Sequence, residues 1–432
     1  MFSSLLRSQF IRHVVTLMSG QAGAQLVTIL AAPFVARLFL PEDFGVVALF
    51  IAVVTILSVP ATFRFELATI LPESDTQALK LTKLSFILVI LACCIVLIMT
   101  ITLSFFSLIP SLLETLDIWI WFIPIILFFR AGIKVVEGWA TRKKQYRIMA
   151  SSDIGQAIIT SGGRISLGVL FGTSIWALIS SYLAGLAFKF FVQLRYAKIP
   201  FSDIKNDSGK AELVNIGKEY SDFPLYNMPS GLIRTFAQNI PIIMFGVYFG
   251  PAVVGLYAMA NRLFRMPVNF LSRAIRRVLL QKLSELKNSG RNLSAPYIKM
   301  TLWLSLFSIL PTFVLWLIGS DLCVFFLGET WTEAGRFVEI LTPWLFTIVV
   351  ASPATAIIVV YRKQKIWLRY NIIVTSIQFF GFVISHYIWA DAETALIIFV
   401  VSGILANLYI MAYAYVVVSN NISPDVIENH SS

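Results

Sequence analysis

Arginines placed deep inside apolar stretches are the feature of this sequence with the clearest chemical meaning. An ionised group at the centre of a bilayer costs about 2.5–3.5 kcal/mol, so it normally faces water, a ligand or an opposite charge. Arg234, Arg262 and Arg265 lie in two stretches that contain no acidic residue. We therefore predict that these guanidinium groups line a hydrated cationic cavity. The alternative is that each forms an ion pair with a distant helix.

Guanidinium groups bind phosphate oxygens in a bidentate geometry and remain protonated, so an arginine-lined cavity suits an anionic substrate. Arg130 and Arg164 are further candidates for this cavity. Lys134 and Glu137 are one helical turn apart and would neutralise each other, which leaves Arg130 on the same face without a local partner. Asp153 and Glu137 are candidates for coupling to an ion gradient. Whether Asp153 couples to protons or forms an interhelical pair is open at this stage.

Residues for catalysis or metal binding are poorly represented. The histidines and cysteines are scattered over His13, His386, His430, Cys93, Cys94 and Cys323. They form no nucleophilic triad, metal-ligand spacing or disulfide framework, and no glycine-rich phosphate loop is present. We therefore expect a protein that is not an enzyme and has no cofactor and no metal. A smaller group of charges lies near the ends of apolar stretches and should extend toward lipid headgroups: Arg37, Arg64, Glu66 and Arg336.

The composition places these charges in a membrane protein. Of 432 residues, 58% are hydrophobic and only 13% are charged, against about a quarter in soluble domains. Repeated apolar stretches of about twenty residues predict an all-α polytopic membrane protein, and the alternating strands of a β-barrel are not seen. The net charge of +11 lies mostly in alternate short loops, without base-stacking aromatic residues, so we expect no nucleic-acid partner.

About twelve transmembrane helices are predicted, in two six-helix bundles around a central cavity. Their ranges are 14–37, 44–69, 81–106, 118–140, 146–171, 174–196, 223–248, 251–275, 298–319, 336–360, 366–389 and 394–417. Prolines inside four of them should kink the helices: Pro33, Pro124, Pro241 and Pro353. The corresponding domains are an N-terminal bundle (1–197), a cytoplasmic linker (198–222), a C-terminal bundle (223–418) and a disordered cytoplasmic tail (419–432).

The loops alternate in charge. Basic loops include Lys80/Lys83, Arg142 to Arg147, Lys189 to Lys218, Arg273 to Lys299 and Arg362 to Arg369, and acidic loops include Glu42/Asp43, Glu114/Asp117, Asp321 to Glu333 and Asp391/Glu393. Because basic loops remain in the cytoplasm, both termini are predicted to be cytoplasmic. Arg7 and Arg12 precede a long first span with no clear cleavage site, which argues against a cleaved signal peptide.

A short motif occurs twice at a fixed separation. Phe39, Pro41, Gly45 and Ala48 are matched, 210 positions later, by Phe249, Pro251, Gly255 and Ala258. In both copies an apolar run precedes the proline and another follows the glycine. A proline-initiated turn repeated in this way favours a duplicated half, whereas independent recruitment of proline and glycine to short loops is the alternative.

Three motifs lie near the N-terminus: Ser19-Gly-Gln-Ala-Gly23, Leu38-Phe-Leu-Pro-Glu-Asp-Phe-Gly45, and Phe63-Arg-Phe-Glu-Leu-Ala68 followed by Leu71-Pro-Glu73. With these motifs the chain resembles the polysaccharide (O-antigen, Wzx-type) flippases of the multidrug/oligosaccharidyl-lipid/polysaccharide exporter superfamily. The resemblance implies transfer of an undecaprenyl-pyrophosphate-linked oligosaccharide across the bacterial inner membrane for O-antigen or capsule synthesis. It also implies membrane lipids, the polysaccharide polymerase and the chain-length machinery as partners.

Two other functions compete with the flippase reading. A multidrug or small-molecule exporter of the same superfamily is disfavoured because a cationic cavity repels cationic drugs. A non-transporting membrane scaffold for polysaccharide assembly gives no reason for several mid-span arginines. The sequence fixes neither the glycan nor the coupling ion, which the resemblance suggests is a proton or sodium.

Overall fold

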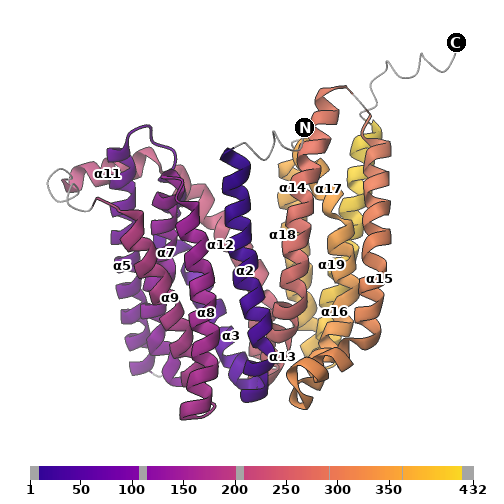
Figure 1. The fold of residues 1–432 in the computed structure, drawn as a ribbon, viewed down its shortest axis with the longest axis horizontal. Helices are drawn as coiled ribbons and strands as arrows, with labels where there is room; N and C mark the ends of the chain where they lie inside the picture. Colours follow the sequence, from indigo (N-terminus) through magenta and orange to yellow (C-terminus); the bar gives the residue numbers. More distant parts are fainter. Residues whose placement is uncertain (1–8, 107–113, 201–208, 291, 362, 421–432) are drawn as a thin grey trace. The chain divides into compact units, whose positions relative to one another are not determined.

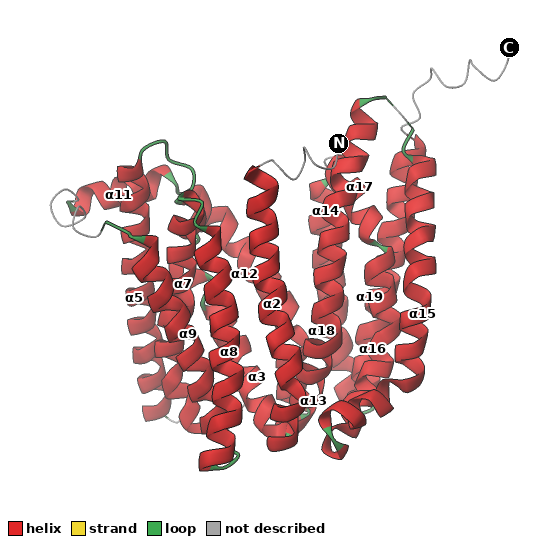
Figure 2. Ribbon diagram, viewed as in Figure 1, coloured by secondary structure: helices red, strands yellow, loops and turns green. Residues whose placement is uncertain are grey.

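The computed structural model describes residues 9–106, 114–200, 209–290, 292–361 and 363–420. Within these ranges the chain consists of helices joined by short loops, and no strand is present (Figure 2). Ten of the described helices are long and apolar enough to cross a membrane. The predicted all-α polytopic membrane fold is therefore confirmed.

The chain divides into two compact units, residues 1–255 and 256–432. The helical elements of the first unit are α2 (Gln9–Leu38), α3 (Pro41–Leu57), η1 (Pro60–Thr62), α4 (Phe65–Ala68), α5 (Asp75–Phe105), η2 (Asp117–Phe122), α7 (Ile123–Arg142), α8 (Tyr146–Phe171), α9 (Ile175–Ala197), α11 (Lys210–Glu219), η3 (Phe223–Asn227) and α12 (Met228–Tyr248). Helix α13 (Gly250–Ala260) begins in this unit and continues into the next. The boundary predicted in the linker 198–222 stays a prediction.

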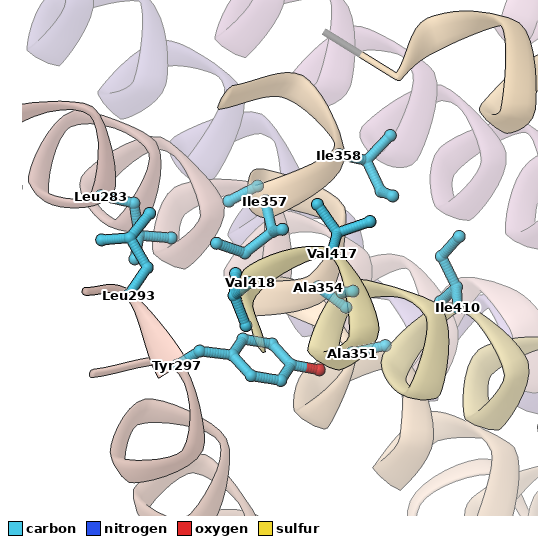
Figure 3. Close-up of a cluster of buried hydrophobic side chains, with 12 residues drawn as sticks. Leu283, Leu293, Tyr297, Ala351, Ala354, Ile357, Ile358, Ile410, Val417 and Val418 are labelled. Atoms are coloured by element: carbon cyan, nitrogen blue, oxygen red, sulfur yellow. The ribbon is translucent and has the colours of Figure 1, made fainter. Parts of the chain in front are cut away.

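The second unit contains η4 (Asn261–Arg265), α14 (Met266–Asn288), α15 (Ser294–Leu327), η5 (Glu329–Trp331), α16 (Thr332–Val350), α17 (Ser352–Val360), α18 (Gln364–Ile388) and α19 (Ala392–Asn420). Its apolar core joins α14, α15, α17 and α19, with Ile357, Ile410 and Leu283 fully buried (Figure 3). The hydroxyl of Tyr297 donates to the carbonyl oxygen of Met411 at 2.8 Å, which ties α15 to α19. This packing holds the helices that carry the second set of candidate site residues.

Helices α2, α8, α9 and α7 pack in succession in the first unit (Figure 1). Small residues allow the closest approach: a side chain at Gly20 of α2 would overlap Ala150 of α8. At one end of the unit, Arg142 donates to the carbonyl oxygens of Pro72 (2.6 Å) and Glu73 (3.2 Å) and to the carboxylate of Asp75 (2.9 Å). Gly20, in the motif Ser19–Gly23, therefore has a structural role in helix packing. The segment Leu71–Glu73 also has a structural role, because Arg142 binds its backbone.

Several predicted helix boundaries differ from the structure at prolines. The span predicted over 44–69 ends as helix α3 at Leu57, because Pro60 cannot continue the backbone hydrogen bonding. Pro124 and Pro353 begin α7 and α17 instead of kinking longer helices, since the first turn needs no N–H donor. Pro33 and Pro241 do lie inside helices, as predicted.

The two spans predicted over 223–248 and 251–275 are helical but are not among the ten apolar helices. Polar residues interrupt their hydropathy, and each contains a π-helical turn, over 223–227 and 261–265. A proline follows each turn closely, Pro229 in one case and Pro267 in the other. Because proline lacks an N–H, it favours a local widening of the helix. Such turns are frequent at functional sites.

The duplicated motif makes reciprocal contacts with itself. A side chain at Gly45 of α3 would overlap the carbonyl oxygen of Pro251, and one at Gly255 of α13 would overlap the carbonyl oxygen of Pro41. Pro41 stands at the first position of α3, where its fixed φ is compatible with the helix. The two copies of the motif therefore cross backbone against backbone at a point where only glycine fits.

Some predicted features fall on residues outside the described ranges. The predicted tail 419–432 is described only to residue 420, where α19 ends. Within the predicted linker 198–222, residues 201–208 are outside the described ranges, and α11 (Lys210–Glu219) follows them. Arg7 also lies outside them.

Candidate anion-binding site

Two cations of the first unit are held by neutral oxygen atoms. Arg130 of α7 donates from Nη1 to the hydroxyl of Tyr182 on α9 at 2.6 Å. One turn later, Lys134 donates from Nζ to the carbonyl (3.0 Å) and hydroxyl (2.9 Å) oxygens of Ser58. Among the described residues, no carboxylate lies within 4 Å of either cation. Their hydrogen bonds are therefore partly satisfied while their charge is not directly neutralised.

Arg64 lies close enough to Lys134 to interact with it electrostatically, as does Glu66. Phe63 and Arg64 both adopt the left-handed conformation, with φ of 48° and 64°, which is unusual for residues with side chains. This turn buries Glu66 and brings Arg64 within 3.5 Å of it. The expectation that Arg64 and Glu66 extend to lipid headgroups is therefore wrong, because both side chains turn into the unit.

The guanidinium of Arg64 lies against Gly231 of α12. Beside Gly231, and on the same side of the helix, exposed polar residues follow one another in a stripe at helical spacing from the end of η3 into α12: Asn227, Ser230, Arg234 and Gln238. Arg234 is among the predicted site residues, and it makes no hydrogen bond or ion pair with the described residues. A charged stripe of this kind is unfavourable against lipid, which favours a hydrated environment for Arg234.

In the second unit, the π-helical turn carries both Arg262 and Arg265. The guanidinium of Arg265 lies over the indole of Trp344 on α16, 4.3 Å from the ring centroid. Its Nη1 donates to the buried hydroxyl of Tyr257 at 2.8 Å. Stacking on a tryptophan face stabilises a guanidinium without neutralising its charge, and it leaves the edge of the group available for further hydrogen bonds.

The position of Trp344 is fixed by its own neighbours. Phe399 of α19 packs edge-to-face against the indole, with 5.0 Å between ring centroids. A side chain at Gly403, one turn further along α19, would overlap the indole. The tryptophan is therefore a rigid support for Arg265, and this support depends on the absence of a Cβ at residue 403.

The predicted coupling residues are brought together by a lysine. Lys189 of α9 contacts Glu137 of α7 at 2.8 Å and Asp153 of α8 at 2.6 Å. Glu137 therefore pairs with Lys189, and the proposed neutralisation between Lys134 and Glu137 along one helix is replaced by contacts to other helices. Asp153 forms an ion pair with another helix. This is the second of the two roles considered for it, the first being proton coupling. Arg164, eleven residues further along α8, is only 5% exposed.

The neutral partners are not predictable from the sequence. Tyr182, Tyr257 and Trp344 are three of many aromatic residues, and nothing in their spacing distinguishes them. The loop-charge pattern places Lys189 in a basic loop, whereas the structure places it well inside α9. Its signal was its position within the apolar run that ends at Ala197. No group of three or more metal-binding side chains occurs among the described residues.

The architecture resembles that of known transporters. A multidrug resistance transporter of the MATE family, from the MOP superfamily, has a TM-score of 0.68 at 14% identity, covering 95% of this chain and 96% of that chain. The lipid II flippase MurJ has a TM-score of 0.72 at 13% identity, covering 94% and 90%. Among curated proteins, none matches this chain. The chain therefore shares its fold with these two proteins.

A more specific assignment comes from the sequence family. The model of a family described as "Polysaccharide biosynthesis protein" matches residues 34–336. This match covers most of the chain, and the protein belongs to that family. It is a multi-pass membrane protein.

Proposed function

We propose that the protein is a flippase for an undecaprenyl-pyrophosphate-linked oligosaccharide in the synthesis of a surface polysaccharide such as O-antigen or capsule. The observation that carries this proposal is that Arg130, Lys134 and Arg265 are held by neutral partners. Cations held in this way retain attraction for an anion, and a pyrophosphate can accept hydrogen bonds from several of them. Membership of a polysaccharide biosynthesis family supports a glycan-linked anion as the substrate.

The proposed mechanism is alternating access. The two bundles rock about their connection, so that the site opens to one side of the membrane and then to the other. The cationic groups hold the pyrophosphate or acidic sugars inside, while the lipid chain remains in the bilayer. The candidates for these cationic groups are Arg130, Arg234, Arg262 and Arg265. Arg164 is a further candidate in the first unit.

The charge also separates this proposal from its alternatives. A cationic drug would be repelled by Arg130 and Arg265, so export of such compounds is disfavoured. A membrane scaffold would have no need of cations stacked on a rigid tryptophan inside a helical unit. Contacts with the polysaccharide polymerase or the chain-length machinery remain a proposal from the family resemblance.

The proposed location is the bacterial inner membrane with both termini in the cytoplasm. In a variant without native cysteines, a single cysteine at Asn288 should be protected from an impermeant thiol reagent in intact cells with a permeabilised outer membrane. One at Thr330 should react, because it lies in an acidic loop. Both residues are exposed. Labelling of residue 288 from outside, with residue 330 protected, would reverse the proposed topology.

Gene deletion provides a direct test of the substrate class. Cells without this protein should accumulate a lipid-pyrophosphate-linked oligosaccharide on the cytoplasmic leaflet and lose the corresponding surface polysaccharide. Mass spectrometry of the lipid fraction, combined with leaflet-specific enzymatic access, would measure both. Loss of the polysaccharide with the intermediate on the outer leaflet would point to a step after transfer and contradict the proposal.

A further inference from the structure

A buried ionic cluster joins three helices of the first unit. The Nζ atom of Lys189 on α9 lies 2.8 Å from Oε1 of Glu137 on α7 and 2.6 Å from Oδ1 of Asp153 on α8. The side chain of Lys189 is 11% exposed. The carboxylates are therefore bridged by one ammonium group that is largely removed from solvent.

A polar side chain completes the cluster. Gln193, one turn after Lys189 on α9, donates from Nε2 to the hydroxyl of Ser152 at 2.9 Å and to Oε1 of Glu137 at 3.4 Å. Gln193 itself is fully buried. The cluster thus includes side chains from all three helices, and Gln193 holds Glu137 in place beside the ammonium group.

An ammonium group held by carboxylates of two different helices makes the kind of contacts that a bound monovalent metal cation would make. The group carries the same charge, and its contacts go to oxygen atoms, which are also the ligands of hard cations. Unlike a free ion, it is covalently attached to α9 and cannot dissociate. We propose that Lys189 is a built-in cation that prevents sodium or potassium from binding between Glu137 and Asp153.

The surrounding charges are consistent with this role. If both carboxylates are ionised, Lys189 leaves one negative charge in the cluster. Lys134, one turn before Glu137 on α7, lies within electrostatic range of it. Lys134 also interacts with Glu66, Arg64 and Arg130, so the charges around this cluster already include more cations than carboxylates, and no mobile cation is required for neutrality. Lys189 would then determine which ions the first unit can couple to. Only this consequence rests on the proposed transport function.

The test is cation-dependent thermal stability of the purified protein at pH 8. Wild-type protein should melt at the same temperature in sodium, potassium or choline chloride of equal concentration. Lys189→Ala should melt lower in choline, because two carboxylates lose their partner, and sodium or potassium should restore part of the loss. A cation present at about five times its dissociation constant would raise the midpoint by roughly 1–2 °C, and a saturating concentration would raise it further.

Two further variants make the result specific. Lys189→Arg retains the charge and should remain insensitive to the cation, whereas Asp153→Asn added to Lys189→Ala should remove the gained sensitivity. A folded Lys189→Ala variant that responds to neither sodium nor potassium would overturn the proposal. If the Lys189→Ala variant does not accumulate, the wild-type protein provides the test. Stabilisation of the wild type by sodium or potassium that is lost in Asp153→Asn would overturn the proposal. A wild type that neither cation stabilises would support it. Because the readout is cation binding, these outcomes do not depend on transport.

Discussion

Replacing either Gly45 or Gly255 with alanine should strongly destabilise the protein. A Cβ at either residue would overlap a backbone carbonyl oxygen of the other copy of the repeated motif, at Pro251 or Pro41. Backbone atoms cannot move aside as the end of a flexible side chain can, so the helices would have to separate. Overpacking in a rigid site costs about 3 kcal/mol, which corresponds to a midpoint lower by roughly 3–6 °C for a chain or unit of this size. Thermal unfolding of the purified variants measures this directly.

Gly162→Ala is the matched control. Gly162 also lies within a helix, α8, but a Cβ there would have no neighbouring atom within 4 Å. Alanine has the higher helix propensity, so this variant should be as stable as the wild type or slightly more stable. Unchanged midpoints for both Gly45→Ala and Gly255→Ala would show that the reciprocal crossing of the repeated motifs is not tightly packed.

Removing the charge of Arg130 or Arg265 should abolish transport while the protein still accumulates. Alanine at either residue loses one hydrogen bond, to Tyr182 or to Tyr257. It also removes a charged side chain whose insertion into the membrane costs about 2.5–3.5 kcal/mol, and this gain offsets the lost hydrogen bond. Lysine keeps the charge but loses the planar fork, so we expect partial activity. Glutamate should be the most severe change because it repels the anion. Transport at matched membrane abundance is the measurement.

Variants of the neutral partners separate charge from packing. Tyr182→Phe removes the hydrogen bond to Arg130 but retains the arginine, so transport should fall much less than in Arg130→Ala. Gly403→Ala should displace Trp344 from its position beneath Arg265 and impair transport without changing the net charge. Full transport by both alanine variants, Arg130→Ala and Arg265→Ala, would contradict a role for these cations in substrate binding.

The sequence predicts the helical fold well because its strongest signals are local. Long apolar runs define helices such as α8 (Tyr146–Phe171), whose predicted span has the same limits. Where the chain contains proline, the prediction was less accurate: Pro60 ends a helix and Pro353 begins one, although both lie in apolar surroundings. Hydropathy indicates which segments are apolar, but it does not indicate whether a helix ends before a proline or begins at it.

The candidate site was only partly predictable because it depends on pairs that are distant in sequence. Arg265 could be identified from its charge in an apolar run, but Trp344, on which it stacks, is one aromatic residue among many. Lys189 was attributed to a loop because it precedes other basic residues. Its role is evident only when α9 packs against α7 and α8 and places it between Glu137 and Asp153.

Flipping by the purified protein in liposomes is the most direct test of the central claim. The substrate would be a fluorescent undecaprenyl-pyrophosphate-linked oligosaccharide, and its appearance on the opposite leaflet would be followed by quenching with an impermeant reagent. The wild type should move this lipid, an uncharged analogue should move far more slowly, and Arg265→Glu should be inactive. Equal movement of the charged and uncharged lipids, unaffected by Arg265→Glu, would contradict recognition of the anion by the cationic site.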